Sequence, residues 1–359
     1  MKTRPVAFVF IPLLLILLSS SHALGQATIY LPVVRNGVNQ ELQRDALVAI
    51  YNSTDGDNWL DNEGWLDESV PYCEWSRVEC NDNDAVTILS LGGNYLSGSI
   101  PPEIGNLTAL ETLWLGDSVL ATLPDSIGNL SNLESLGLSN NNFNELPTSL
   151  GNLTNLQWLE LGGNGLVTLP ESMGALTNLR SLDLTHNDVT VLPQTFTNLA
   201  KLEELWLIGN GLTALPESID HLANLHTLVL SENSLSSLPT TIGNLSRLRD
   251  LYLDENNLTA LPESIGSLSS LVTFDVSGNE LVTLPETIGS LANVLTLRLT
   301  NNSLTALPVT ATGLRGLTLP GSSILLLGNP ITCLSTPELV TWYTNIYSAY
   351  PTTLPLCGE

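Results

Sequence analysis

Basic residues are scarce in this chain. Only 11 Lys and Arg stand against 36 Asp and Glu, which gives a formal net charge of −25. A field of this sign repels nucleic acid and anionic membrane surfaces, so neither is expected as a partner. A cationic partner or metal ions could balance the charge, but solubility is its simplest explanation.

Groups that carry catalysis are scarce as well. Beyond residue 25 the only histidines are His186, His221 and His226, and the chain has no Gly-x-Ser-x-Gly motif and no phosphate-binding loop. Paired acids such as Asp254 and Glu255 are expected on an open surface, with no cleft to perturb their pKa values. The sequence therefore predicts no enzyme, no cofactor and no bound metal.

The four cysteines fall into two distant pairs, Cys73 with Cys80 and Cys333 with Cys357. In an exported chain this arrangement predicts two local disulfides. Zinc binding is the alternative, but no His and no second Cys pair lies near either group.

Long apolar runs are absent except at the start of the chain. Residues 6–18 are apolar, follow Lys2 and Arg4, and precede the small residues up to Gly25. This layout predicts a signal peptide over residues 1–25. A signal anchor is the alternative, although the run is shorter than the roughly 20 residues that span a membrane. Cleavage would leave 9 basic and 36 acidic residues, a charge of −27. We therefore expect a secreted protein without a membrane span, in which residues 26–40 form a linker.

What the sequence has in abundance is a hydrophobic pattern that returns every 23 residues. The residues that hold the same place in it are Leu113, Leu136, Leu159, Leu182, Leu205, Leu228, Leu251, Phe274 and Leu297. A period of this length indicates a solenoid, in which each unit adds one short strand and one turn.

The unit that starts at Leu159 shows how one coil is built. Leu159 and Leu161 point inward and Glu160 outward, because side chains alternate along a strand. Pro170 and Glu171 suit the start of a short helical turn on the outer side. An Asn follows at the sixth position of nearly every unit, where a buried amide can satisfy unpaired backbone groups. These residues are Asn94, Asn141, Asn164, Asn187, Asn210, Asn233, Asn256, Asn279, Asn302 and Asn329, with Ser118 as the exception.

The units begin at Leu89 and end at Ile324, which predicts eleven strands. The last step is longer than the others, and we expect residues 310–323 to protrude as a loop.

The repeats resemble the leucine-rich repeat superfamily over residues 89–331. The first unit, with the sequence Leu96-Ser97-Gly98-Ser99-Ile100-Pro101, is similar to the plant-type class, and later units are closer to the L-P-x-x-I-G class. The resemblance implies an α/β solenoid, a right-handed superhelix of about eleven coils whose parallel sheet lines the concave side.

The flanking segments resemble the caps of this family. Residues 41–88, which include Cys73 and Cys80, resemble a plant-type N-terminal cap, and residues 332–359 resemble a cysteine-bearing C-terminal cap. A cap covers the core at the open end of a solenoid. The tryptophans in these segments are expected to be core aromatics: Trp59, Trp65, Trp75 and Trp342.

Positions beside the strand leucines should project from the concave sheet. Large indoles there are hard to explain by folding, and Trp and Tyr are frequent among interface hot spots. Packing over neighbouring strand residues is the alternative for the aromatics, and a plain solvated surface for the acids. We also expect Gly137 to leave room between two indoles for a flat ligand. The predicted ligand-binding residues are Trp114, Trp158, Glu160, Asp183, Glu204, Trp206, Asp250, Tyr252, Asp275 and Arg298.

The resemblance implies a recognition module, and the acids favour a basic protein or peptide as its ligand. The alternatives are an inhibitor of a secreted enzyme and an adhesive surface protein that binds glycans. The chain also carries seven sequons, which would make it a glycoprotein in a eukaryotic secretory pathway unless they only follow the repeat consensus. They are at Asn52, Asn106, Asn129, Asn152, Asn244, Asn257 and Asn301.

Overall fold

The structure, a computed structural model, describes residues 34–35, 38–346 and 354–358. The predicted signal peptide and most of the predicted linker lie outside these residues. In the described part of the linker, β1 (Val34–Arg35) pairs antiparallel with β2 (Val38–Asn39). No helix in the described part of the chain is long and apolar enough to cross a membrane.

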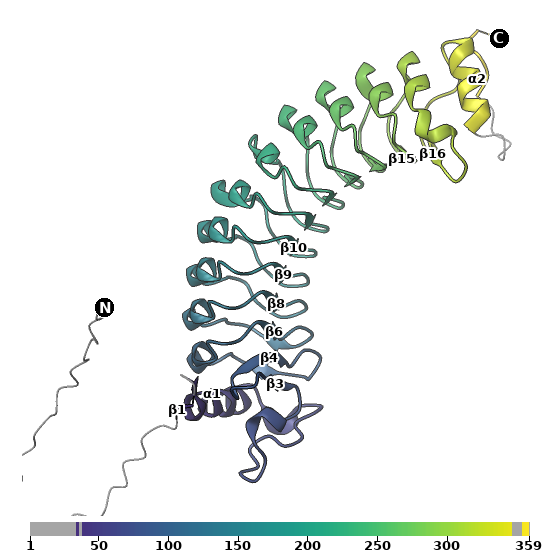
Figure 1. Ribbon diagram of the computed structural model, residues 1–359. Coiled ribbons are helices and arrows are strands. Elements are labelled where there is room, and N and C mark those ends of the chain that lie inside the picture. Colours follow the sequence, from purple (N-terminus) through teal and green to yellow (C-terminus); the bar gives the residue numbers. More distant parts are fainter. Residues whose placement is uncertain (1–33, 36–37, 347–353, 359) are drawn as a thin grey trace, which may run out of the picture.

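The described repeats form a curved stack with one sheet along its inner side (Figure 1). Its eleven parallel strands confirm the predicted coils, and each of these strands contains the buried periodic leucine or its equivalent. The strands are β4 (Val86–Ser90), β6 (Thr112–Trp114), β8 (Ser135–Gly137), β9 (Trp158–Glu160), β10 (Ser181–Asp183), β11 (Glu204–Trp206), β12 (Thr227–Val229), β13 (Asp250–Tyr252), β14 (Thr273–Asp275), β15 (Thr296–Arg298) and β16 (Ser323–Leu325).

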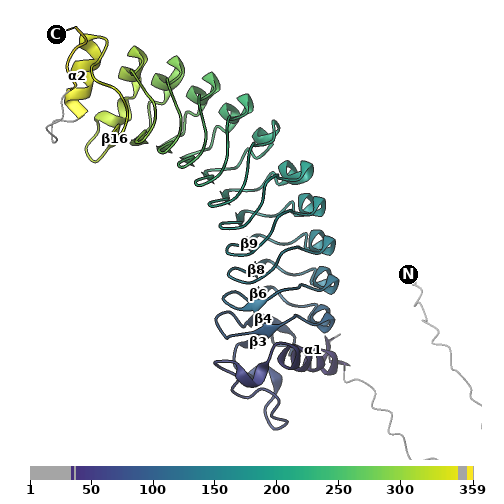
Figure 2. The ribbon, with the colours of Figure 1, turned by 180° about the vertical axis from the view of Figure 1, so that it is seen from behind.

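Short 3₁₀ turns form the outer side of the stack, which Figure 2 shows from behind. Most contain five residues and begin directly after a proline whose φ is already fixed near the helical value. The turns are η3 (Pro102–Asn106), η4 (Asp125–Asn129), η5 (Thr148–Asn152), η6 (Glu171–Ala175), η7 (Gln194–Asn198), η8 (Ile219–His221), η9 (Thr240–Asn244), η10 (Glu263–Ser267), η11 (Glu286–Ser290) and η12 (Val309–Gly313). Because a turn is wider than a strand, the stack bends toward its sheet.

The asparagine ladder is confirmed. Asn187 Nδ2 donates to Leu161 O and Leu184 O, each at 3.0 Å, and its Oδ1 accepts from Leu166 N at 3.1 Å. The same three kinds of bond recur from Asn141 to Asn329. Asn94 instead binds the N-terminal cap through both backbone groups of Asp61. At the exceptional Ser118 a small extra ladder pairs β5 (Ser97–Gly98) with β7 (Val119–Leu120).

The N-terminal cap closes the first coil with α1 (Gln40–Ser53) and with β3 (Val78–Cys80), which pairs antiparallel with β4. Two short turns lie between them, η1 (Gly56–Asn58) and η2 (Tyr72–Glu74). The helix begins after Asn39, whose side chain accepts from Leu42 N at 3.2 Å.

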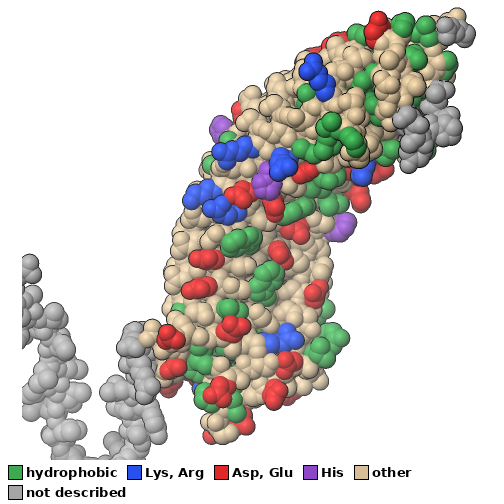
Figure 3. Space-filling model, turned by 45° about the vertical axis from the view of Figure 1, so that its right-hand side comes forward, with side chains coloured by type: hydrophobic (Ala, Val, Ile, Leu, Met, Phe, Trp, Pro, Cys, Tyr) green, Lys and Arg blue, Asp and Glu red, His purple; other side chains and the backbone are tan. Residues whose placement is uncertain are grey.

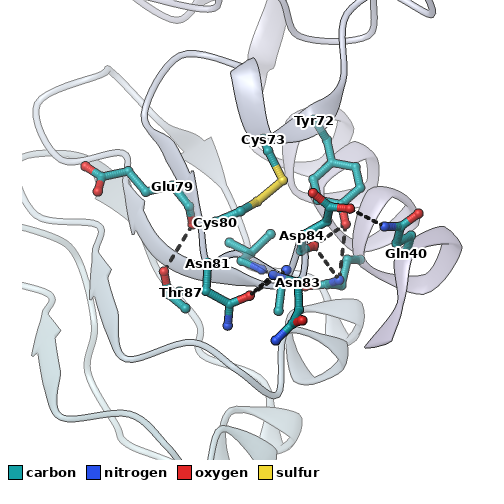
Figure 4. Close-up of a disulfide and its surroundings, with 12 residues drawn as sticks. Gln40, Tyr72, Cys73, Glu79, Cys80, Asn81, Asn83, Asp84 and Thr87 are labelled. Carbon is teal, nitrogen blue, oxygen red and sulfur yellow. Dashed lines mark hydrogen bonds between the residues drawn. A yellow bond between two sulfur atoms is a disulfide. The ribbon is translucent and has the colours of Figure 1, made fainter. Parts of the chain in front are cut away.

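The predicted disulfide Cys73–Cys80 joins η2 to β3 and is confirmed (Figure 4). Beside it, the Tyr72 hydroxyl donates to Asp84 O at 2.5 Å and accepts from Gln43 Nε2 at 3.2 Å. Burial and the Asp84 charge raise the pKa of Tyr72 to about 12. The bridge and this half-buried tyrosine fix the outer loops of the cap onto α1.

The tryptophans of the caps are core residues, as predicted. Trp59, Trp65 and Trp75 are buried, with ring centroids 4.8 Å apart for Trp59 and Trp65 and 5.0 Å apart for Trp65 and Trp75. Trp342 is buried in α2 (Pro337–Ile346), and the Cys333–Cys357 disulfide ties that end together.

The prediction that residues 310–323 protrude as a loop is wrong in part. They contain a further 3₁₀ turn, η13 (Arg315–Thr318), in which Gly316 and Leu317 are buried. Gly316 N donates to Ala292 O at 2.8 Å, so this insertion packs on the preceding coil. Only its outer residues, including Leu319, remain exposed.

Candidate ligand-binding face

The concave face consists of two columns of side chains, one on each side of the buried strand leucines. Strand pairing is in register, so from β6 to β15 every residue in a column lies beside the residue 23 positions away. The spacing is 24 between β4 and β6 and 27 between β15 and β16. Residues far apart in sequence therefore form a continuous surface.

The structure brings half of the predicted site residues together on three adjacent strands. Trp158 and Glu160 lie on β9, Asp183 on β10, and Glu204 and Trp206 on β11. Asp183 is the direct neighbour of both Glu160 and Trp206. Trp158 is 44% exposed although it is a large apolar side chain. We call these five residues the acidic-aromatic patch.

The carboxylates of the acidic-aromatic patch differ in their surroundings. Burial, and secondly the charge of Asp183, raise the pKa of Glu160. Asp183 accepts a hydrogen bond from Thr185 N at 2.8 Å. Glu204 has no ion pair or side-chain hydrogen bond within the described residues. The patch thus holds negative charge that the rest of this surface does not neutralise.

Asp250 and Tyr252 lie apart from the acidic-aromatic patch, on β13. Val229 of β12 separates Tyr252 from Trp206 and is itself buried. Asp250 and Glu204 are separated by the half-buried Thr227. These two residues therefore extend the same face without touching the patch.

Two of the predicted site residues neutralise each other. Asp275 was expected to project as an open carboxylate, and this is wrong: it is buried, with 6% of its surface exposed. Its Oδ2 lies 3.2 Å from Arg298 Nη1, and its Oδ1 accepts from Ser277 N at 3.0 Å. The pair closes the C-terminal end of the acidic surface.

The expected room beside Gly137 is also absent. A Cβ atom at Gly137 would lie 2.2 Å from Trp114 Cε3 and 2.7 Å from its Cζ3. The indole of Trp114 thus covers Gly137 of the next coil and fills the space itself. Trp114 is half-buried. It therefore packs over a strand neighbour, which was the alternative to ligand binding for these aromatics.

Sequence reasoning missed a feature that borders this face. The fifth residue of each coil has a positive φ, between 53° and 78°. Large side chains there lie over a glycine of the next coil, as His186 does over Gly209 and Glu255 over Gly278. The alternation of Gly with Asn, Asp, His and Glu at this position was the available signal.

A second amide ladder on the outer side was missed as well. Each of its side chains donates to a carbonyl 24 residues earlier, as Asn178 Nδ2 does to Thr154 O at 2.7 Å. Its members are Asn132, Asn155, Asn178, Asn224 and Asn293.

Within the described residues, no three His, Cys, Asp or Glu side chains are grouped closely enough to hold a metal ion. All seven sequon asparagines are exposed.

Family models match much of the repeat region. The model described as "Leucine-rich repeat region" matches residues 125–212 and 240–319, and that described as "Leucine Rich Repeat" matches residues 85–107 and 224–245. A solved leucine-rich repeat protein of Leptospira interrogans is 33% identical, with a TM-score of 0.51, over 71% of this chain and 75% of that chain. The chain belongs to the leucine-rich repeat family.

This leucine-rich repeat protein is also similar to plant members of the family. Leucine-rich repeat protein 1 of Arabidopsis thaliana is 39% identical over 22% of this chain and 35% of its own length. The match thus spans about a third of that relative. The Arabidopsis receptor kinase HAESA, solved with the peptide hormone IDA and the co-receptor SERK1, is 28% identical with a TM-score of 0.61. That likeness covers 83% of this leucine-rich repeat protein and 54% of the receptor chain.

Proposed function

We propose that this leucine-rich repeat protein is a secreted, non-enzymatic recognition module that binds a basic segment of a protein or peptide along its concave face. The acidic-aromatic patch is the centre of the site, and Asp250 and Tyr252 extend it. Residues 1–25 would direct export, residues 41–88 and 332–359 would act as caps, and residues 89–331 would bind the ligand.

The observation that carries the proposal is the exposed Trp158 beside carboxylates that lack a cationic partner. Apolar surface of this size gains free energy when a partner covers it, and the surrounding charge selects a basic partner. The HAESA structure supports a peptide ligand because that receptor has a comparable stack of repeats. The two disulfides support export, since such bonds persist in oxidising compartments.

The test is a pull-down from the native extracellular medium, followed by affinity measurement with the partner found. Trp158→Ala and Trp206→Ala should each weaken binding about 30-fold, the equivalent of about 2 kcal/mol for a hot-spot aromatic. Tyr95→Ala is the matched control, because Tyr95 is 67% exposed but lies outside both strand columns.

Three results would contradict the proposal. These are a glycan as the partner, an unchanged affinity of both Trp variants, and a large drop in their melting temperature, which would show that the indoles are structural. Capture of a secreted enzyme whose activity falls on binding would instead favour an inhibitor.

A further inference from the structure

Positive charge is concentrated on one part of this acidic protein. The structure describes eight Lys and Arg side chains, and five of them lie on the segments that lead from an outer turn into the next strand or on the insertion after η12. We call the surface of these segments the entry-side face. The five residues are Arg180, Lys201, Arg247, Arg249 and Arg315. In Figure 3 Lys and Arg side chains gather over the C-terminal half of the visible face, with hydrophobic side chains beside them.

Three of these arginines surround an open hollow of about 650 Å³. Arg247 and Arg249 precede β13, and Arg315 lies in η13 of the insertion. The apolar lining includes Val272, Leu295 and Leu319, of which Leu295 is 37% and Leu319 is 55% exposed. The hollow therefore combines cationic side chains with an uncovered apolar surface.

The arginines of the hollow have no carboxylate partner within the described residues. Arg77, Arg180 and Arg298 each form an ion pair, with Asp61, Glu203 and Asp275 respectively. Arg247, Arg249 and Arg315 form none, although the chain has 36 acidic residues. Arg247 donates only to the neutral Asn224 Oδ1. These charges are therefore available to an anionic ligand.

The sign of the charge changes along this face. Two residues before the strand leucine, the coils carry in order Glu111, Glu134, Gln157, Arg180, Glu203, His226, Arg249, Val272 and Leu295. The last carboxylate of this column, Glu203, is paired with Arg180, and the coils of the hollow add only Arg249 and apolar residues to it. Charge is screened over about 8 Å at physiological salt, so the electrostatic potential that acts on a short ligand in the hollow comes mainly from the arginines. A long polyanion would also meet the acidic coils and be repelled.

We propose that this hollow is a second docking site, which takes a short acidic segment of another protein. Carboxylates of that segment would receive paired hydrogen bonds from Arg249 and Arg315, and one apolar side chain would cover Leu295 and Leu319. The site uses no residue of the concave face, so it does not depend on the recognition function proposed above.

The test uses a labelled peptide with blocked ends, acetyl-Asp-Glu-Leu-Glu-Asp-amide, and fluorescence anisotropy with the purified protein. We expect saturable binding, and about tenfold weaker binding or more for Arg249→Glu and for Arg315→Glu, because each loses a charge-assisted contact. Replacing the peptide leucine with alanine should weaken binding as well. The neutral peptide acetyl-Asn-Gln-Leu-Gln-Asn-amide should not bind.

Lys201→Glu is the matched control. It makes the same charge change on the same face but lies outside the hollow, where Lys201 donates to Asn178 Oδ1. Its affinity should stay within about twofold of wild type because of screening. Thermal unfolding of all variants checks that they are folded.

The proposal is overturned if binding of the acidic peptide does not saturate, or if Arg249→Glu and Arg315→Glu bind the peptide like wild type. Tighter binding of a sulfated oligosaccharide than of the peptide would overturn it too. So would a protein that does not bind the peptide but self-associates through this hollow, so that Arg249→Glu abolishes the self-association.

Discussion

The indole of Trp114 lies over Gly137 of the following coil, where a Cβ atom would be 2.2 Å from its Cε3. This contact shows how the concave surface is built. Here a large side chain in one coil lies over the next coil, and this packing requires a small residue at position 137. A protruding aromatic on this sheet can therefore be structural, whereas Trp158 is 44% exposed and remains open to a partner.

Gly137→Ala should destabilise the protein because the new methyl group displaces the Trp114 indole. We expect a loss of about 1–3 kcal/mol in the free energy of unfolding, as for other overpacked sites. The φ of Gly137 is not positive, so alanine itself fits the backbone. In a Trp114→Ala background the same substitution should be nearly neutral. Urea unfolding of the four proteins measures the coupling, and an equal cost in both backgrounds would disprove the contact.

The inner asparagine ladder should matter far more than the outer one. Asn187→Ala leaves two carbonyls and one backbone N–H without their amide partner in the interior, so we expect a loss of about 2 kcal/mol or more. Asn155→Ala removes a single exposed bond to Ser131 O and should cost less than about 1 kcal/mol. Calorimetry of both variants makes the comparison. Equal losses would show that burial of the amide is not what stabilises the stack.

The raised pKa of Glu160 predicts a pH-dependent stability. Burial, and then Asp183, raise its folded-state pKa above the unfolded value, so the folded protein binds more protons between these two values. The free energy of unfolding therefore falls as pH rises through that window. Glu160→Gln abolishes this loss: it should be more stable than wild type above the window, and the difference should vanish below it.

Thermal melts across the acidic range and at neutral pH measure this effect. An Asp183→Asn background is the control, because it removes the second cause of the raised pKa and should shrink the gain from Glu160→Gln. A gain that is the same at every pH would mean that the substitution acts through packing and not through the charge.

The sequence by itself determined the stack. The eleven coils, the inward leucines and the asparagine ladder follow from residue type at fixed spacing, because each coil repeats the same environment. Both disulfides follow from the grouping of the four cysteines into two distant pairs outside the coils. The positive φ at the fifth position of each coil could also have been predicted, because glycine alternates there with polar residues that tolerate this conformation.

Only the tertiary structure decided what the surface residues do. The neighbours of a surface side chain lie 23 residues away, and their size and charge set its exposure. This is why Trp114 packs on Gly137, why Asp275 is buried against Arg298, and why burial, and then the charge of Asp183, raise the pKa of Glu160. It is also why Arg247, Arg249 and Arg315 surround one hollow, since the insertion that brings Arg315 there packs on its neighbouring coil instead of protruding.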